Sequence, residues 1–176
     1  MSAYSIINID LIKSMTNMPT ENTTKDNLYS IAIKAGIKAS ENYCRRNFNQ
    51  QEYVEKGFAI GDDIQLSSLP VIEVKEVKID DDIITDYVLF KSLGIVEFEE
   101  VYENDFEVTY TGGYTTLPDD LLQGICLVII NMFTKYQKIA DGANSVVTSD
   151  GTINYNMEAI PQEAKQILNR YKRLRI

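Results

Sequence analysis

The chain has 176 residues and carries 17 Lys and Arg against 26 Asp and Glu, a formal net charge of −9. Hydrophobic residues make up 44% and charged residues 24%, which excludes a wholly disordered chain and a disulfide-dense miniprotein and fits a single domain. The acidity argues against a protein that holds nucleic acid by neutralising phosphates, and the absence of histidine removes the commonest general base and metal ligand.

The first 49 residues predict two helices. Asn8 is placed to cap a short helix of one or two turns that ends by Met15. Apolar residues then recur at helical spacing, which predicts a second helix over 24–46, with Thr23 and Asp26 as a variant capping box. The N-terminus has neither a basic segment nor a small-residue cleavage site, so we expect no secretion signal.

Residues 50–111 predict an inserted antiparallel β segment. Strands are expected at 71–75, 77–79, 87–90, 95–98 and 106–110. The first two alternate out of phase, which indicates a bulge or bend at Lys75–Glu76. The acidity is concentrated here, because residues 50–110 hold four basic and sixteen acidic side chains.

Residues 112–176 predict two more helices. Pro118 opens a long helix over 121–140, apolar nearly all round from Ile125 to Ile130 and therefore expected to be the core helix. That apolar run is far too short to span a membrane. Residues 143–156 are polar and are expected to be mobile. Pro161 then opens an amphipathic helix with a basic end. The predicted class is α+β: a small helical bundle of two N-terminal and two C-terminal helices around the β segment, in one domain.

Few residue patterns point to chemistry. Cys44 and Cys126 lie 82 positions apart without a CxxC spacing, and we interpret them as buried thiols. The run Asp80 to Asp82 with Asp86 could ligate Mg²⁺ or Ca²⁺, but it lacks the spacing of an EF-hand, so we favour a solvated hairpin tip. We expect no catalytic residue, no cofactor and no metal.

The serial order of short phrases is more informative than any one of them. After the first two helices come Leu69-Pro-Val-Ile-Glu-Val-Lys-Glu-Val77, Gly94-Ile-Val-Glu-Phe98 and Val108-Thr-Tyr-Thr-Gly-Gly-Tyr114. Leu117-Pro-Asp-Asp-Leu121 and Pro161-x-x-Ala164-x-x-x-Leu168-x-x-Tyr171 follow. In this order, over almost the whole chain, the sequence resembles the tailed-bacteriophage head-tail connector family, whose members are also called head-tail adaptors or head completion proteins.

The resemblance implies a structural protein of the virion, without enzymatic activity, that acts in viral assembly and DNA packaging. Such proteins form a homo-oligomeric ring, commonly of twelve subunits, beneath the portal, where they join head to tail and extend the DNA channel. The implied partners are the portal protein, a tail or stopper protein and further copies of the chain. Duplex DNA passes through without specific binding, no membrane is involved, and assembly takes place in the host cytoplasm.

The charges fit the same picture. An acidic wall does not neutralise phosphates, so it would let DNA slide. We therefore expect part of the acidic segment to face the channel or its rim: Asp80, Asp81, Asp82, Glu97, Glu99 and Glu100. For portal docking we single out the basic end, on charge alone: Arg170, Lys172, Arg173 and Arg175.

Three alternatives stay open. The first is another phage neck component, such as a stopper or tail completion protein. The second is a carboxylate-metal enzyme centred on Asp80 to Asp86 and the Glu97 cluster. The third is a cytosolic binding module with no role in a phage.

Overall fold

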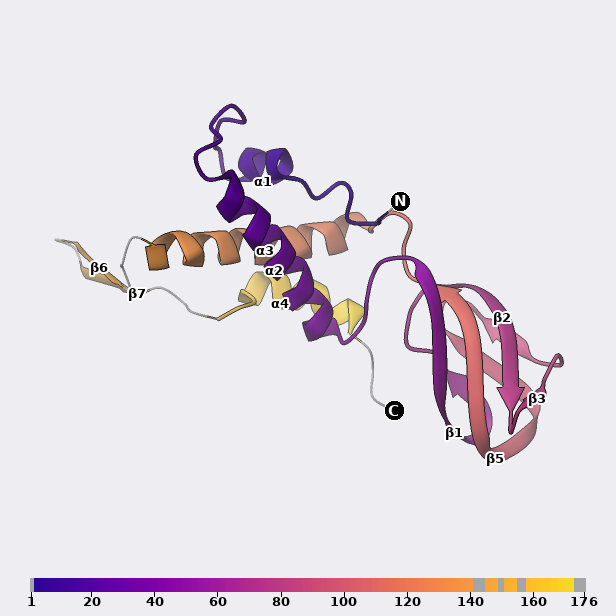
Figure 1. Ribbon diagram of the computed structural model, residues 1–176. Coiled ribbons are helices and arrows are strands. Elements are labelled where there is room, and N and C mark those ends of the chain that lie inside the picture. Colours follow the sequence, from indigo (N-terminus) through magenta and orange to yellow (C-terminus); the bar gives the residue numbers. More distant parts are fainter. Residues whose placement is uncertain (1, 141–144, 149–150, 155–157, 173–176) are drawn as a thin grey trace. The chain divides into compact units, whose positions relative to one another are not determined.

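The computed structural model describes residues 2–140, 145–148, 151–154 and 158–172 (Figure 1). The chain divides into two compact units. The β unit consists of Met1–Tyr4 and Arg46–Leu117, and the helical unit consists of Ser5–Arg45 and Pro118–Ile176. Helices from both ends of the chain therefore share one unit, with the sheet inserted between them in the sequence, and the predicted α+β class is confirmed.

The N-terminal helices lie where the sequence predicts them, but one cap differs. Helix α1 spans Ile9–Met15, and Asn8 caps it by accepting a hydrogen bond at Oδ1 from the Leu11 backbone N at 2.8 Å. Helix α2 spans Asp26–Cys44, within the predicted 24–46. The predicted capping box at Thr23 is wrong, because the N-cap of α2 is Lys25, whose side chain makes no cap hydrogen bond.

Helix α3 forms the centre of the helical unit. It spans Asp119–Ala140, close to the predicted 121–140, and both α2 and α4 pack against it. Helix α4 spans Gln162–Leu168 and continues into the 3-10 turn η1, Asn169–Tyr171. The buried apolar side chains of this core include Ile12, Tyr29, Ala32, Leu121, Ile125, Val128, Ile129, Phe133, Ala164 and Leu168.

Helices α2 and α3 approach each other closely. The rings of Tyr29 and Phe133 stack with centroids 3.9 Å apart and planes inclined by 8°. Gly36 faces Ile129, and a Cβ at Gly36 would lie only 2.9 Å from the Ile129 Cα. The absence of a side chain at Gly36 therefore sets the spacing of the two helices.

Both cysteines are buried and free, as predicted. The Cys44 Sγ donates a hydrogen bond to the Leu168 carbonyl at 3.4 Å. Burial raises the pKa of the Cys126 thiol to about 11, so this group is a neutral thiol at physiological pH.

The segment between α3 and α4 contains a hairpin that the sequence does not predict. Strand β6 (Ser145–Thr148) pairs antiparallel with strand β7 (Gly151–Asn154). The expectation that residues 143–156 are mobile stays a prediction, and the residues of this stretch outside the two strands are not among the described ones. Val146, Val147 and Ile153 are of the β-branched residue types that favour strands.

The β unit contains a five-stranded antiparallel sheet (Figure 1). Its strands are β1 (Gln51–Gln65), β2 (Val71–Ile79), β3 (Asp82–Ile83), β4 (Val88–Phe90) and β5 (Ile95–Gly112). Strand β5 pairs with β1 along one side, and with β2 and β4 along the other; β3 pairs with β2. The antiparallel character predicted for the insertion is confirmed.

Strand lengths in this sheet differ from those expected. The strands predicted at 95–98 and 106–110 are one continuous strand, β5, and no separate strand is predicted for β1. The predicted bulge at Lys75–Glu76 is confirmed, because the register of β2 against β5 shifts between Val74 and Glu76.

A larger irregularity interrupts the pairing of β1 with β5. The partner of Gly61 is Tyr102, but the partner of Asp63 is Glu97. Four residues of β5 (98–101) therefore stand opposite a single residue of β1. Such a bulge bends the strand and increases the local twist of the sheet.

One face of this sheet carries the core of the β unit. The buried apolar side chains are Ala59, Ile64, Leu66, Val71, Val77, Ile79, Val96, Phe98, Val108 and Tyr110. Among the described residues, no helix has both the length and the apolar character needed to cross a membrane.

Candidate functional site

The predicted acidic hairpin tip is a tight turn held to β5. Asp80 and Asp81 are the two residues between β2 and β3, with φ of 48° and 70°, the positive values that a type I′ turn requires. The Asp80 carboxylate accepts a hydrogen bond from the Asn104 side chain and another from the Asp105 backbone N at 3.1 Å. Asp81 and Asp82 are exposed. The tip is therefore a fixed acidic projection.

The second predicted acidic group lies on another part of β5. Glu97, Glu99 and Glu100 are exposed and lie in or beside the bulge, where Glu97 pairs with Asp63. The Asp80 turn is instead held at residues 104–105 of the same strand. In the described part of the chain, no three His, Cys, Asp or Glu side chains are arranged to hold a metal ion. The structure therefore adds no support to the carboxylate-metal enzyme alternative.

Two lysines interrupt the acidic surface of the sheet. Lys56 and Lys78 line a hollow of about 580 Å³ next to the Asp80 turn. Lys56 pairs with Glu107, and its hydrogen bond lowers the pKa of that carboxyl. Lys78 pairs with Glu76 at 2.5 Å, and this hydrogen bond raises the pKa of the lysine. The hollow thus presents fixed charges of both signs.

The basic end has intramolecular contacts in the part that the structure describes. The Arg170 Nη1 lies 3.4 Å from the Asp120 Oδ2 at the start of α3, and the Asp120 pKa is lowered, first by a hydrogen bond from the Tyr171 hydroxyl. The Lys172 Nζ lies over the Tyr43 ring, 4.1 Å from its centroid. The other two predicted docking residues, Arg173 and Arg175, lie outside the described residues.

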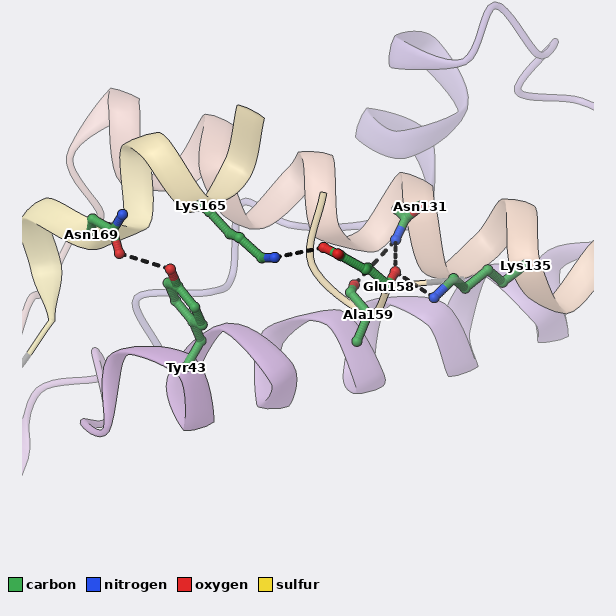
Figure 2. A network of polar contacts seen from close by, with 7 residues as sticks. All are labelled: Tyr43, Asn131, Lys135, Glu158, Ala159, Lys165 and Asn169. Carbon is green, nitrogen blue, oxygen red and sulfur yellow. Dashed lines mark hydrogen bonds and ion pairs between the residues drawn. The ribbon is translucent and has the colours of Figure 1, made fainter. Parts of the chain in front are cut away.

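A polar network that the sequence does not predict seats α4 on the other helices (Figure 2). The Asn131 Nδ2 donates to the carbonyls of Glu158 and Ala159 at 2.9 and 3.2 Å, and Lys135 also donates to the Glu158 carbonyl. The Glu158 carboxylate accepts from the Lys165 Nζ at 2.5 Å, which lowers the Glu158 pKa.

The same network reaches helix α2. The Tyr43 hydroxyl donates to the Asn169 Oδ1 at 2.7 Å (Figure 2). Tyr43 and Asn169 are 126 positions apart in the sequence, so no local spacing could have revealed the pair. The end of the chain is therefore held on two helices, α2 and α3, before its last basic residues.

A buried ion pair holds α1 on the helical unit. The Lys13 side chain is 2% exposed, and its Nζ lies 2.7 Å from the Asp26 Oδ1. It also donates to the Thr20 carbonyl at 3.0 Å. The sequence shows Lys13 only as a polar residue on a short helix, so its burial was missed. Removal of Asp26 would leave a buried ammonium without its counter-ion, which is strongly destabilising.

Comparison with known proteins gives one family. A sequence model of the head completion protein family matches residues 5–174. Among solved structures, the chain is similar to a chain in the neck of an empty GTA particle computed with C6 symmetry. The TM-score is 0.59 with 14% sequence identity, over 95% of this chain and 89% of that chain. At that identity the likeness shows the fold alone. A comparison with curated proteins gave no match.

Proposed function

Because the chain belongs to the head completion protein family, we propose that it is a structural protein in the neck of a phage or phage-like particle. It forms a ring beneath the portal, joins the head to the tail and extends the channel through which DNA passes. The observation that carries this proposal is the family match, which spans both units. The fold shared with a chain of the GTA neck supports it.

The role is one of contact rather than catalysis. Its partners are further copies of the chain, the portal protein, and a tail or stopper protein, and the protein resides in the virion after assembly in the host cytoplasm. A stopper or tail completion protein would share this chemistry but dock at another level of the neck. The partner bound by the purified chain separates these positions.

The acidic β unit suits a channel that DNA must cross. Its main segment, residues 46–117, holds five basic and sixteen acidic side chains, and the predicted channel residues of the tip and of β5 are exposed. Each phosphate that a protein neutralises adds affinity through counterion release. An acidic wall avoids this attraction, so we place Asp80 to Asp82, or Glu97 to Glu100, at the channel or its rim.

The basic end supplies the charge for portal docking. Arg170 and Lys172 make exposed contacts within the helical unit, and contacts of this kind contribute little to stability. They can therefore be exchanged for contacts with an acidic surface of the portal at small cost. Arg173 and Arg175 extend the same basic sequence.

Native mass spectrometry tests this function. The purified chain is measured alone and mixed with the portal ring encoded in its source genome, and we expect a closed complex of cyclic stoichiometry. A variant with Arg173→Glu and Arg175→Glu should lose portal binding, whereas the control Lys34→Glu with Lys38→Glu, which changes charge equally on α2, should keep it. A folded chain that ignores the portal but binds a tail component would move it to the stopper position.

The channel assignment has its own test. Particles are assembled with Glu99→Lys and Glu100→Lys, and DNA retention and ejection are compared with the control Glu21→Lys in the helical unit. We expect slowed or incomplete ejection only for the β5 variant. Unchanged ejection would remove the channel assignment and leave the neck role intact.

A further inference from the structure

The sheet of the β unit has two edges of different kinds. Strand β1 uses one side to pair with β5, and among the described residues no strand pairs with its other side. This open edge belongs to a strand of 15 residues. On the opposite side the sheet ends in the short strands β3 and β4 and in the part of β2 before Lys78, with which no described strand pairs on that side. A long open edge strand is a template for pairing with another chain.

Both edges carry exposed apolar side chains. On β1, Phe58 is 58% and Ile60 is 77% exposed. On the opposite edge, Ile83 of β3 is 61% and Val88 of β4 is 57% exposed. Soluble proteins protect open edges with charges, prolines or bulges that discourage pairing. Strand β1 does carry charges and the bulge between Gly61 and Asp63, so the exposed apolar surface before that bulge, at Phe58 and Ile60, is the part suited to contact with another chain.

The two edges are matched in level and in the face that carries their apolar residues. Paired residues connect Lys56 on β1 through β5 and β2 to Ile83 on β3. Ile83 therefore shares one face of the sheet with Lys56 and with Phe58, two residues further along β1. Apolar pairs across neighbouring strands are stabilising.

The strand directions also fit. Strand β1 is antiparallel to β5, β5 is antiparallel to β2, and β2 is antiparallel to β3. It follows that β1 runs antiparallel to β3. When a second copy in the same orientation is moved sideways across the strands, its β1 comes to lie beside the first copy's β3. The two strands are then antiparallel, so the sheet can continue from one copy to the next without turning either copy over. Contacts of this head-to-tail type generate rings when the rotation between subunits closes.

We propose that the β1 edge of one copy docks on the β3 edge of the next copy, and that this contact links neighbouring subunits of the ring. The occupant of the open edge is thus a second copy of this chain. The inference rests on the proposed function, because it identifies which surfaces close the ring. The β unit then belongs to the wall of the ring, and its apolar edge residues are buried between subunits.

Disulfide trapping tests the contact directly. Native Cys44 and Cys126 are buried, so an introduced cysteine is the reactive one. Four single variants on β1 (Val54→Cys, Lys56→Cys, Phe58→Cys and Ile60→Cys) are each mixed with Ile83→Cys and oxidised, both alone and with the portal ring. Directly opposed antiparallel residues lie within disulfide reach. Exposed Ile31→Cys of α2, mixed with Ile83→Cys, measures the collision background.

We expect one variant of the four on β1, or two that are neighbours in this set, to cross-link to Ile83→Cys. The yield of this cross-link should be at least tenfold above the collision background. The double variant with Phe58→Cys or Ile60→Cys together with Ile83→Cys should give a ladder of oligomers. Phe58→Asp should reduce ring formation at least tenfold with an unchanged melting temperature, whereas Ile31→Asp should not.

The outcomes separate the two proposals. A chain that binds the portal as a ring but gives only background cross-linking overturns the edge contact and leaves the neck function standing. Cross-links of a β1 variant with itself, and not with Ile83→Cys, overturn the head-to-tail arrangement in favour of a two-fold contact. A chain that neither assembles nor binds the portal overturns both proposals.

Discussion

Leu168 is the largest side chain that α4 buries in the helical unit. Leu168 is fully buried, and its Cδ2 comes within 3.4 Å of the place where a side chain on Gly124 of α3 would begin. A buried Leu→Ala change costs about 2–5 kcal/mol through lost transfer energy and a residual cavity. Helix α4 has only seven residues, too few to be stable by itself. We therefore expect Leu168→Ala to release α4 before the rest of the unit unfolds.

Hydrogen exchange followed by mass spectrometry measures this release. Because 1.4 kcal/mol is a factor of ten, a cost of at least 2 kcal/mol raises the exchange rate of amides in residues 162–171 by about 30-fold or more. Amides in the middle of α2 and α3 should change much less. Ile139→Ala, which truncates an exposed side chain of α3, is the matched control and should leave α4 unchanged. Unaltered exchange in α4, or an equal increase throughout the unit, would refute a separately seated α4.

Three further predictions concern the helical unit. Gly36→Ala should lower the free energy of unfolding by about 1–3 kcal/mol in urea titration, because overpacking against the backbone of α3 outweighs the gain of about 1 kcal/mol in helix propensity; a more stable variant would contradict the close approach. The lowered pKa of Glu158 means that its ion pair stabilises the fold above pH 4.5 and is lost as the pH falls below that value. Thermal melts of wild type and Glu158→Gln should therefore converge toward pH 3, and a constant difference would argue against the pair. With a pKa of about 11, Cys126 should be labelled by a thiol reagent at pH 8 only after unfolding, and rapid native labelling would show that it is not enclosed.

Local signals in the sequence were reliable where one residue or one periodicity decides the structure. The Asn8 cap, the bulge at Lys75–Glu76 and the long apolar helix are of this kind. The capping-box prediction failed because Thr23 contacts Asp26 through its backbone. The Thr23 carbonyl accepts a hydrogen bond from the Asp26 backbone N at 3.1 Å, and the residue types alone do not distinguish this backbone turn from a side-chain cap.

The sheet was harder to predict because its strands depend on distant partners. Glu99 and Glu100 interrupt the alternation within β5, so that one strand is expected as two, although pairing with β1 and β2 holds it together. Similarly, β1 carries apolar residues on both faces and shows no clean period of two. The charge of the basic end could be read from the sequence. Its attachment could not, because Asn131 contacts the residues just before α4 and Tyr43 contacts Asn169 just after it only in the folded chain.

The β unit also has a feature that bears on how such chains diversify. Where the chain enters and leaves the sheet, Asn49 and Tyr114 form a parallel bridge, and the Tyr114 backbone N donates to the Phe48 carbonyl at 2.8 Å. The two ends of a 72-residue excursion are therefore clamped side by side. A module joined through such a clamp can be lengthened, trimmed or exchanged by recombination without shifting the register of the helices. We therefore expect the helical unit to accept another module in place of the β unit, provided that the two ends of that module meet in the same way.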